Sequence, residues 1–538
     1  MSGSAHRVPW GQKAAPRGRY DIGADFRAER TRWVSAPAAL SSRVIGICGL
    51  GAALASLIDL AYGAHAALAL AILALGALAV GFAGMRGCRF PPSIRSGSLL
   101  TTVGVAWLAA IVFSTLVYVA TRATARVDDA LFESVAGFTT TALSVMDNEG
   151  LEDTAKGVLF WRALTQWFGG FGALITFVVA LPFLGVGDPT EPVESRSTAR
   201  STNLLAPQAR RRVKRFASVY LGLSGIGVLL FLGGGMSPFD AVTYAFTTVS
   251  TGGFANHEGS IGFFESPALE WFAIAGMLLA GANFALLWSA VRGRTHTRLL
   301  ESFELRAYLG LIGAASGALL LFNASGAGFS ARTVRQTVFT VVSLVSTTGH
   351  HLDDWTAWKA GGQLVLLMLM GVGAMSGSAG GGFRILRVLV LISLIRRELA
   401  RQVHTHSVMV VRLGRQVIDE GVIGRMVGHM VLHTLAVAGG AIAIAAFYLG
   451  GAEPDRRLLT ALSGAVSALS TTGPALEGLG PTTSVLDLPA GARAVLAALM
   501  LGGRLAFYPI LAIVEAARVG SRAARRSLRR RRLRLIRR

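Results

Sequence analysis

The stretch Val338-Phe-Thr-Val-Val-Ser-Leu-Val-Ser-Thr-Thr348-Gly349 decides how this sequence folds. Its first ten residues have helical character, but a span needs about 20 predominantly apolar residues to cross the hydrocarbon core of a bilayer. Apolar segments long enough to cross lie on both sides of it. The stretch is therefore predicted to be re-entrant, which means that it enters the membrane and returns to the side from which it came.

The same pattern occurs three more times along the chain. The other copies run from Leu131 to Thr141-Ala142, from Ala241 to Gly253-Phe254 and from Leu462 to Thr472-Gly473. Each copy lies between two predicted spans, and a repeat of this kind determines the fold before other features are considered. Four ordinary polar loops would explain one Thr-Thr-Gly segment, but they explain poorly why all four copies stand at the same place.

The composition also indicates a membrane protein. The 538 residues are 52% hydrophobic and 15% charged, whereas a soluble domain carries about 25% charged residues. The net charge of +22 would suggest nucleic acid in a soluble protein, but here the basic residues gather in the tails and in alternate loops. The positive-inside rule then places both termini in the cytoplasm. The predicted spans lie near 42–62, 66–84, 99–121, 157–185, 215–235, 268–290, 306–323, 361–395, 429–450 and 490–515.

These features predict an all-α membrane protein with ten transmembrane helices. Four span–re-entrant loop–span repeats in a pseudo-fourfold arrangement follow an N-terminal two-helix hairpin. The expected units are a basic cytoplasmic N-terminal tail that lacks a fixed structure (1–41), the hairpin and its loop (42–98), repeat 1 (99–185), repeat 2 with the cytoplasmic loop before it (186–290), repeat 3 (291–395), repeat 4 (396–515) and an Arg-rich cytoplasmic tail (516–538).

Four re-entrant loops around one axis have the chemistry of a cation pore. A short helix that enters from outside directs its negative C-terminal end at the centre of the pore. The residues after it can turn backbone carbonyls inward, where they replace the hydration shell of a cation. The predicted filter residues are Thr140, Thr141, Ala142, Thr251, Gly252, Thr348, Gly349, Thr472 and Gly473.

Several segments resemble the Trk/Ktr/HKT superfamily of potassium transporters, specifically its TrkH branch, over about residues 42 to 515. The matching segments are Leu159 to Gly170 (Leu-Phe-Trp-Arg-Ala-Leu-Thr-Gln-Trp-Phe-Gly-Gly), Ser250 to Phe254, Gly281 to Leu286, the glycine-rich Gly371 to Arg387 and Leu501 to Leu505. The extra N-terminal hairpin is also typical of the TrkH branch. The resemblance implies potassium as the transported ion, bound at the carbonyls of Thr141, Thr251, Thr348 and Thr472.

The same resemblance implies a gate beneath the filter. Its expected parts are Arg504 and the intramembrane loop that contains Gly371, Gly373, Gly377, Gly380, Gly381 and Gly382. It also implies a homodimer in the bacterial inner membrane, with one pore per subunit, and a cytosolic ring of nucleotide-binding, TrkA/KtrA-like regulatory subunits. No organic cofactor and no nucleic-acid partner are expected.

Single charged residues and histidines have two possible roles each. Arg504 lies inside an apolar span, where a charge indicates function by default, although it could also hold carbonyls in place. Arg162 is expected to be structural, paired with an acid or reaching toward the surface. The acids Asp128, Asp129, Glu133, Asp147, Glu149, Glu152 and Asp153 are expected at the outer mouth, where they attract cations or form a solvated rim.

Two pairs of histidines need separate interpretation. His350 and His351 follow the third filter directly, so they either tune ion admission with pH or lie on the surface. His429 and His433 stand four residues apart, a spacing that can bind a metal on one helix face, but no acid or cysteine accompanies them. We therefore expect no metal there.

Ala142 departs from the family pattern, which has glycine at this position of the first filter. Alanine in a left-handed conformation costs about 1–2 kcal/mol, so the local carbonyl is expected to turn away. In the plant branch a side chain at this position accompanies sodium transport, so an alternative function is less selective K+/Na+ transport. The pore subunit of a potassium pump complex shares the four-repeat plan and is a further alternative. A membrane-embedded enzyme is disfavoured because the spans carry almost no paired carboxylates, and a scaffold would not need four filter-like loops.

Overall fold

The computed structural model describes residues 22–88, 96–146, 151–179, 207–291, 301–327, 329–404, 409–414, 416–447 and 454–519. Helices dominate these ranges, and the short antiparallel hairpin of β1 (Arg412–Leu413) and β2 (Gln416–Val417) is the sheet found within them. The Arg-rich tail from residue 520 and the acids Asp147 and Glu149 lie outside the described residues.

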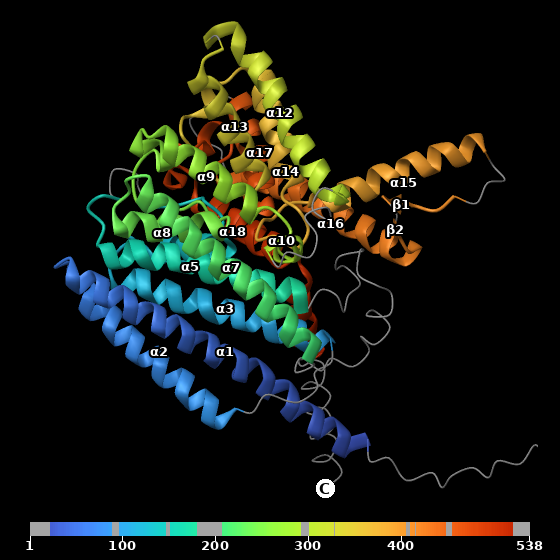
Figure 1. Cartoon of the computed structure of the whole chain (residues 1–538). Helices are drawn as coiled ribbons and strands as arrows, with labels where there is room; N and C mark the ends of the chain where they lie inside the picture. The colour runs from blue at the N-terminus through green and yellow to red at the C-terminus, as the bar shows by residue number, and fades with distance from the viewer. Residues whose placement is uncertain are drawn as a thin grey trace, which may run out of the picture.

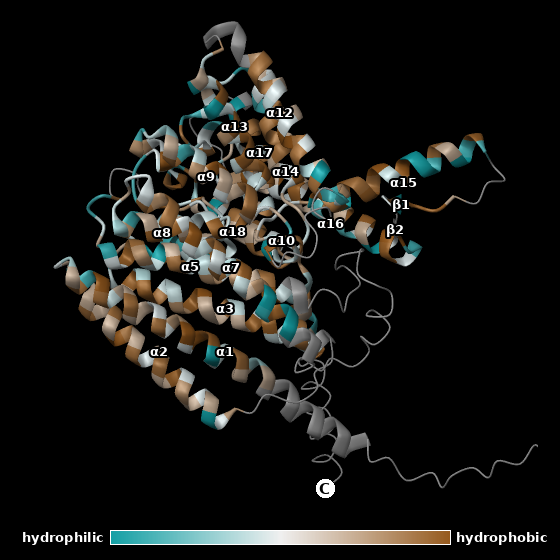
Figure 2. Ribbon diagram, viewed as in Figure 1, coloured by the Kyte–Doolittle hydropathy of each residue, from teal (hydrophilic) through white to brown (hydrophobic). Residues whose placement is uncertain are grey.

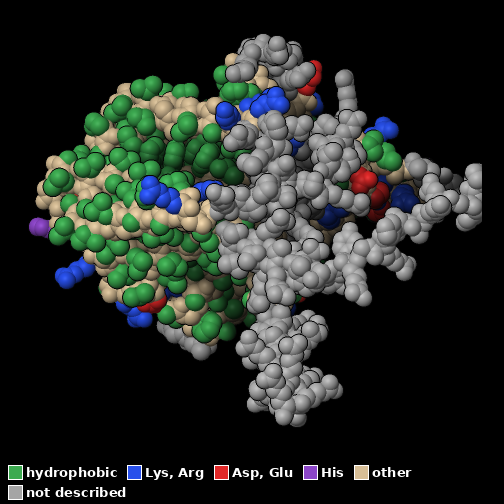
Figure 3. Space-filling model, turned by 90° about the horizontal axis from the view of Figure 1, so that it is seen from below, with side chains coloured by type: hydrophobic (Ala, Val, Ile, Leu, Met, Phe, Trp, Pro, Cys, Tyr) green, Lys and Arg blue, Asp and Glu red, His purple; other side chains and the backbone are tan. Residues whose placement is uncertain are grey.

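The N-terminal hairpin consists of α1 (Ile22–Ala61) and α2 (Ala67–Gly87), which pack side by side against α3 (Ser96–Ala120) (Figure 1). The helix α1 begins at Ile22, well before residue 42, so the prediction of an unstructured tail is wrong for residues 22–41. Hydrophobic residues run along both helices of the hairpin (Figure 2). From below, side chains of this kind cover most of the described face (Figure 3). Leu57, Leu68 and Leu75 of these helices are more than half exposed, as expected for side chains that face lipid.

Four short helices stand where the sequence predicts re-entrant segments. They are α4 (Val127–Thr139), α8 (Pro238–Val249), α13 (Ala331–Val345) and α17 (Pro454–Ser470). Each follows a longer helix in the chain: α3, α7 (Pro207–Gly233), α12 (Phe303–Ala327) and α16 (Glu420–Phe447). Their first residues are capped in two cases by serine, because Ser237 and Ser330 accept hydrogen bonds from the backbone N–H groups three residues on.

The helix after each short helix differs among the repeats. In repeat 1 it is the single helix α5 (Lys156–Val179). In repeat 2, α9 (Pro267–Ala280) and α10 (Phe284–Val291) meet at 105°, and in repeat 4, α18 (Ala490–Arg504) and the helix Tyr508–Val519 meet at 103°. In repeat 3, α14 (Ala360–Val372) and α15 (Ile385–Val403) are separated by a loop of irregular backbone. Short 3-10 turns (Ser260–Phe264, Trp355–Ala357, Glu477–Leu479 and Val485–Asp487) complete the connections.

Six helices of the described residues are long and apolar enough to cross a membrane, and each of the two bent pairs can supply one more span. The chain is therefore a multi-pass membrane protein. Neither α5 nor the α14–α15 region passes this test, so the full number of ten spans stays a prediction. The prediction of a break at Gly371–Gly382 within the span over 361–395 is confirmed, because one helix ends at Val372 and the next begins at Ile385. The glycines between these helices disfavour helix formation.

The core has two main halves. Repeats 1 and 4 share one apolar cluster with the hairpin, in which Trp161 and Leu469 are fully buried. Repeats 2 and 3 share the other, built around Tyr244 and Phe339. Indole hydrogen bonds join neighbouring elements: Trp161 donates to the Ser114 hydroxyl and Trp355 to the carbonyl of Ala475. The pore helices therefore lie in a rigid apolar frame that holds their C-terminal ends together.

Candidate functional site: four loops and the segment beneath them

The four short helices end in the same backbone motif. A threonine with left-handed backbone stands one or two residues after the end of each helix. Its φ is 54° at Thr140, 54° at Thr251, 59° at Thr347 and 55° at Thr471. In every copy, the backbone N–H of the residue that follows this threonine donates a hydrogen bond of 2.7 to 2.9 Å to the carbonyl five residues before that residue. Together with a bond from the threonine N–H to the carbonyl three residues back, this is the Schellman end of a helix, a position that usually has glycine.

These angles correct the alignment of the second loop by one residue. Thr251 corresponds to Thr347, so Gly253 rather than Gly252 corresponds to Gly349 and Gly473. All three of these glycines have positive φ, at 78°, 81° and 108°. The carbonyl of Gly252 accepts a hydrogen bond of 2.8 Å from the Gln166 side chain, so it is already used by the scaffold.

Threonine in the left-handed region is strained because it is β-branched. Four such residues in matching places point to a function that requires them, since strain of this kind persists where the surrounding structure enforces it. The Oγ1 atoms of Thr140 and Thr471 are buried and have no hydrogen-bond partner among the described residues. The Thr347 hydroxyl accepts from the N–H of Gly381, and the Thr251 hydroxyl donates to the Ser250 carbonyl. The hydroxyls of Thr140 and Thr471 therefore differ from those of Thr251 and Thr347, which the protein itself engages.

The loops converge on Ala142. A Cβ atom placed on Gly253, Gly349 or Gly473 would lie 2.8, 2.8 or 2.4 Å from the Cβ of Ala142. The loops also touch in order: a Cβ on Gly253 would meet the Thr348 carbonyl, and one on Gly349 would meet the Thr472 carbonyl. Ala142 itself does not have positive φ, so the expected left-handed strain is absent. The first loop instead takes a conformation of its own and brings a methyl group to the meeting point.

A buried ion pair supports the first two loops from behind. The Arg162 Nε lies 2.7 Å from Glu133 Oε1, and both side chains are almost completely buried. Arg162 also donates to Ser144 Oγ and to the Ala255 carbonyl, which link it to the segments that follow both loops. The structural role expected for Arg162 is confirmed. Gln166 is a contact that the sequence did not single out: its side chain bonds both Gly252 and the N–H of Phe254.

The expectation of an acidic outer rim is wrong for Glu133 and Asp129. Glu133 pairs with Arg162, and Asp129 is buried against Arg493. Asp128 forms a partly exposed pair with Arg126, and Glu152 and Asp153 are exposed. Sequence position alone did not distinguish acids on the buried face of α4 from acids in the loop.

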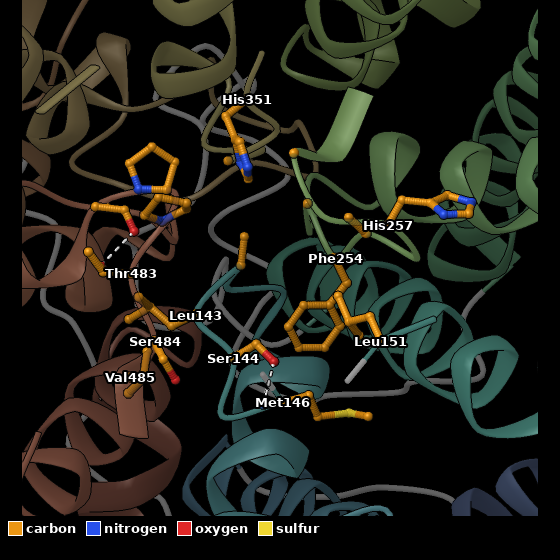
Figure 4. Close-up of a pocket in the computed structure, with 18 of the residues that line it drawn as sticks. Leu143, Ser144, Met146, Leu151, Phe254, His257, His351, Thr483, Ser484 and Val485 are labelled. Atoms are coloured by element: carbon orange, nitrogen blue, oxygen red, sulfur yellow. Dashed lines mark hydrogen bonds between the residues drawn. The ribbon is translucent and has the colours of Figure 1, made fainter. Parts of the chain in front are cut away.

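A cavity of about 60 Å³ lies above the loops, and side chains from all four repeats line it (Figure 4). His257, His351, Phe254 and Leu143 are among its lining residues (Figure 4), and Ala142 also belongs to the lining. His350 is fully buried between the Thr248 and Ser260 hydroxyls, at 3.1 Å from each, so it neither lies on the surface nor faces this cavity. Near the mouth, burial opposes ionisation of Asp240, but hydrogen bonds from His257, Asn256 and Ser237 outweigh it and lower its pKa.

The irregular segment between α14 and α15, residues 373–384, lies directly beneath the loops. The N–H of Gly381 donates to the Thr347 hydroxyl at 2.8 Å, and a Cβ on Gly381 would lie 2.3 Å from the Ser470 carbonyl. Gly373, Gly377 and Gly382 have positive φ, which a side chain would disfavour. Gly371 belongs to the last turn of α14 and has no close neighbour.

The residues at the break between α9 and α10 form backbone hydrogen bonds with the segment 373–384. The N–H groups of Met375 and Ala379 donate to the carbonyls of Gly281 and Ala280, and Phe284 donates back to Gly377. Glu304, a residue that the sequence did not single out, accepts from the N–H of Ser376 at 2.6 Å. The sequence feature that could have identified Glu304 is a single acidic residue in the first turn of an apolar helix.

Arg504 ends α18 at the same depth. Its Nη1 donates to the carbonyl of Ala379 at 2.9 Å, so it contacts the irregular segment directly. Gly503, which precedes Arg504, packs against the carbonyl of Leu469, just as Gly169, which precedes Gly170 in repeat 1, packs against the carbonyl of Phe138. Arg504 therefore occupies the place that Gly170 has in repeat 1, which breaks the symmetry with a charge. His429 and His433 lie nearby, and no group of three or more possible metal ligands occurs among the described residues.

Comparisons with known proteins agree with this geometry. A family model described as "TrkH: Cation transport protein" matches residues 89–325 and 329–519. The chain is 32% identical over 428 residues to the Trk system potassium uptake protein TrkI of Halomonas elongata, covering 79% of this chain and 85% of that protein. It is 30% identical over 392 residues to TrkH of Escherichia coli K12, covering 72% and 78%.

A solved structure gives the same result for the fold. The crystal structure of the potassium transporter TrkH from Vibrio parahaemolyticus superposes with a TM-score of 0.75 at 26% identity, over 87% of this chain and 97% of that one. Because the family model matches well over half of the sequence, the chain belongs to the TrkH family of cation transport proteins.

Proposed function

We propose that this chain forms a pore for potassium uptake, in which the four threonine-ended loops make the selectivity filter. The observation that carries the proposal is the set of four threonines with left-handed backbone, two of which have buried hydroxyl oxygens without a partner among the described residues. Oxygen atoms from hydroxyls and carbonyls suit a dehydrated monovalent cation. The relatives named potassium uptake proteins support potassium as that cation.

The segment 373–384 and Arg504 form the gate in this proposal. The segment touches the third and fourth loops from beneath, and the Arg504 charge lies where a cation leaving the filter would pass. A fixed positive charge at this depth repels cations. A cytosolic regulatory ring of nucleotide-binding subunits would move the segment, and the pore would operate in a homodimer in the inner membrane with both termini cytoplasmic.

A second candidate function is less selective K+/Na+ transport. The methyl group of Ala142 lies where the three other loops have only glycine, and the first loop departs from their backbone conformation. A filter with three equivalent loops and one different loop has fewer matched carbonyls, which weakens discrimination between cations of different size.

Cation flux into liposomes that contain the purified full-length protein tests the proposal. We expect uptake of potassium and rubidium in preference to sodium, and loss of uptake or selectivity in Gly253→Ser, Gly349→Ser and Gly473→Ser. The matched control is Gly313→Ser, because a Cβ at Gly313 meets no atom within 4 Å. Wild-type flux in the three filter variants would refute the filter, and equal potassium and sodium flux in the wild type would favour the second candidate.

A further inference from the structure

A second, smaller cavity lies beneath the loops on the far side of the segment 373–384. Its volume of about 20 Å³ is room for about one particle of the size of a water molecule. Helices α5, α15, α16 and α18 and the segment itself contribute to its wall. The lining side chains that can form hydrogen bonds are Arg384, Arg387, His429, His433 and Arg504.

Several nitrogen atoms in this wall are buried without a hydrogen-bond partner among the described residues. The Nε and Nη2 atoms of Arg504, the Nδ1 atom of His429 and the Nε2 atom of His433 are all in this state. All three residues are more than nine-tenths buried. A buried guanidinium N–H that bonds nothing is costly, and arginine has donors but no acceptor, so the missing partner must supply a lone pair.

The wall is also strongly positive. Three guanidinium groups line the cavity, and none of its lining residues is an acid. Glu304 interacts electrostatically with Arg384, and its carboxylate accepts from the N–H of Ser376. One carboxylate leaves two positive charges unbalanced among the described residues of this region, and buried charges are normally paired.

We propose that this cavity binds one monatomic halide ion, which is chloride under physiological conditions. The guanidinium and imidazole N–H groups supply donors to an anion, and a cation is excluded by the three arginines. The small volume excludes phosphate, sulfate and nucleotides. Ala173, Ala506 and Phe507 also line the cavity and give the site an apolar side that suits an ion with a weakly held hydration shell.

A halide at this position acts on the gate. Gly380, Gly381 and Gly382 line the cavity on one face and touch the filter loops on the other. An anion beside Arg504 offsets the positive charge that a cation meets below the filter. Cation flux should therefore depend on the halide, a consequence that rests on the proposed transport function, whereas the binding site itself does not.

Crystals of the full-length protein grown in potassium bromide test the binding site directly. We expect an anomalous peak for bromide between Arg387, Arg504 and His433. In solution at a constant potassium concentration, the apparent melting temperature should rise and saturate as bromide or chloride replaces gluconate, because a ligand that binds the folded state stabilises it. No peak at this position, together with equal melting in halide and gluconate, would overturn the proposal.

Two variants assign the effect to this cavity. Arg387→Gln and His433→Gln should abolish the halide-dependent part of the melting temperature. Arg401→Gln is the matched control, because Arg401 lies on the same helix as Arg387 but is exposed. A halide effect that persists in both cavity variants would show that the ion binds elsewhere.

The predicted effect of halide on cation flux is measured separately from halide binding. Rubidium flux in liposomes should fall when gluconate replaces chloride on the side facing the cavity, and His433→Gln should remove this dependence. Halide binding without halide-dependent flux would overturn the gating role while leaving the site intact. Absence of flux in every salt would instead count against the proposed pore.

Discussion

At the scale of single residues, Thr140 and Thr471 carry the most direct prediction. Their hydroxyl oxygens are buried and have no partner in the part of the chain that the structure describes, and we propose that they bind the ion. Replacement of either by valine keeps the shape and removes the oxygen. Because a hydrogen bond or contact to a charged group contributes about 1.5–3 kcal/mol, the potassium concentration for half-maximal flux should rise about tenfold or more. Thr434→Val on α16, an exposed threonine, should leave it unchanged.

Ala142 carries the prediction on selectivity. Ala142→Gly removes the methyl group from the meeting point of the loops and permits the positive φ that the three equivalent glycines have. We expect a higher ratio of potassium to sodium flux in liposomes. A ratio equal to that of the wild type would show that this position does not set selectivity.

The pair of Glu133 and Arg162 carries a prediction on stability. Arg162→Ala leaves a carboxylate buried without its partner, which destabilises proteins by about 3–5 kcal/mol. The apparent melting temperature of the purified protein should fall clearly. Arg126→Ala, which breaks the solvent-exposed pair with Asp128, is the control and should melt like the wild type. Equal melting of both variants would contradict the supporting role of the buried pair.

At the scale of elements, the segment 373–384 predicts a contrast between two glycines. A Cβ on Gly381 would lie 2.3 Å from the Ser470 carbonyl, so Gly381→Ala must displace the segment from the filter. We expect higher rubidium flux without any regulatory partner, because the displaced segment no longer closes the pore.

Gly371→Ala adds the same methyl group ten residues earlier, where the nearest atom is a methyl of Val466 at 3.8 Å. This variant should conduct like the wild type. The gate assignment would be wrong if Gly381→Ala had the basal flux of Gly371→Ala while remaining folded.

The sequence predicted the short re-entrant helices because their length and position repeat, but it did not predict the bends. The α9–α10 bend has a local cause in Asn283, whose Oδ1 accepts from the N–H groups of Ala285 and Leu286 and so begins a new helix. Pro509 follows the end of α18, and Ala506 and Phe507 between them have positive φ. Asn283 and Pro509 are visible in the sequence, but hydropathy averaged over a long window does not register single residues of this kind.

The register of the second loop could not be found by aligning letters. Thr251-Gly252-Gly253 offers two glycines, and the first one matches Thr348-Gly349 by type. Only the backbone angle and the hydrogen bond five residues back identify Gly253 as the equivalent of Gly349. The pairing of Glu133 with Arg162 was equally hidden, because it joins residues 29 positions apart.

At the scale of the whole molecule, composition and the fourfold pattern predicted a membrane protein with a pore. The resemblance of segments such as Leu159 to Gly170 and Ser250 to Phe254 to the TrkH branch predicted the family, which the comparisons confirm. The assembly remains a prediction. We expect light scattering of the purified protein, corrected for detergent, to give twice the chain mass of 56.4 kDa. A mass of one chain under the same conditions would contradict the homodimer.

The central claim is that the four threonine-ended loops together hold a dehydrated cation. Anomalous scattering from crystals of the full-length protein grown in rubidium chloride tests it most directly. The account predicts a rubidium peak enclosed by the loops, within bonding distance of oxygen atoms from Thr140, Thr251, Thr347 or Thr471. Well-ordered loops without a rubidium peak between them would contradict it.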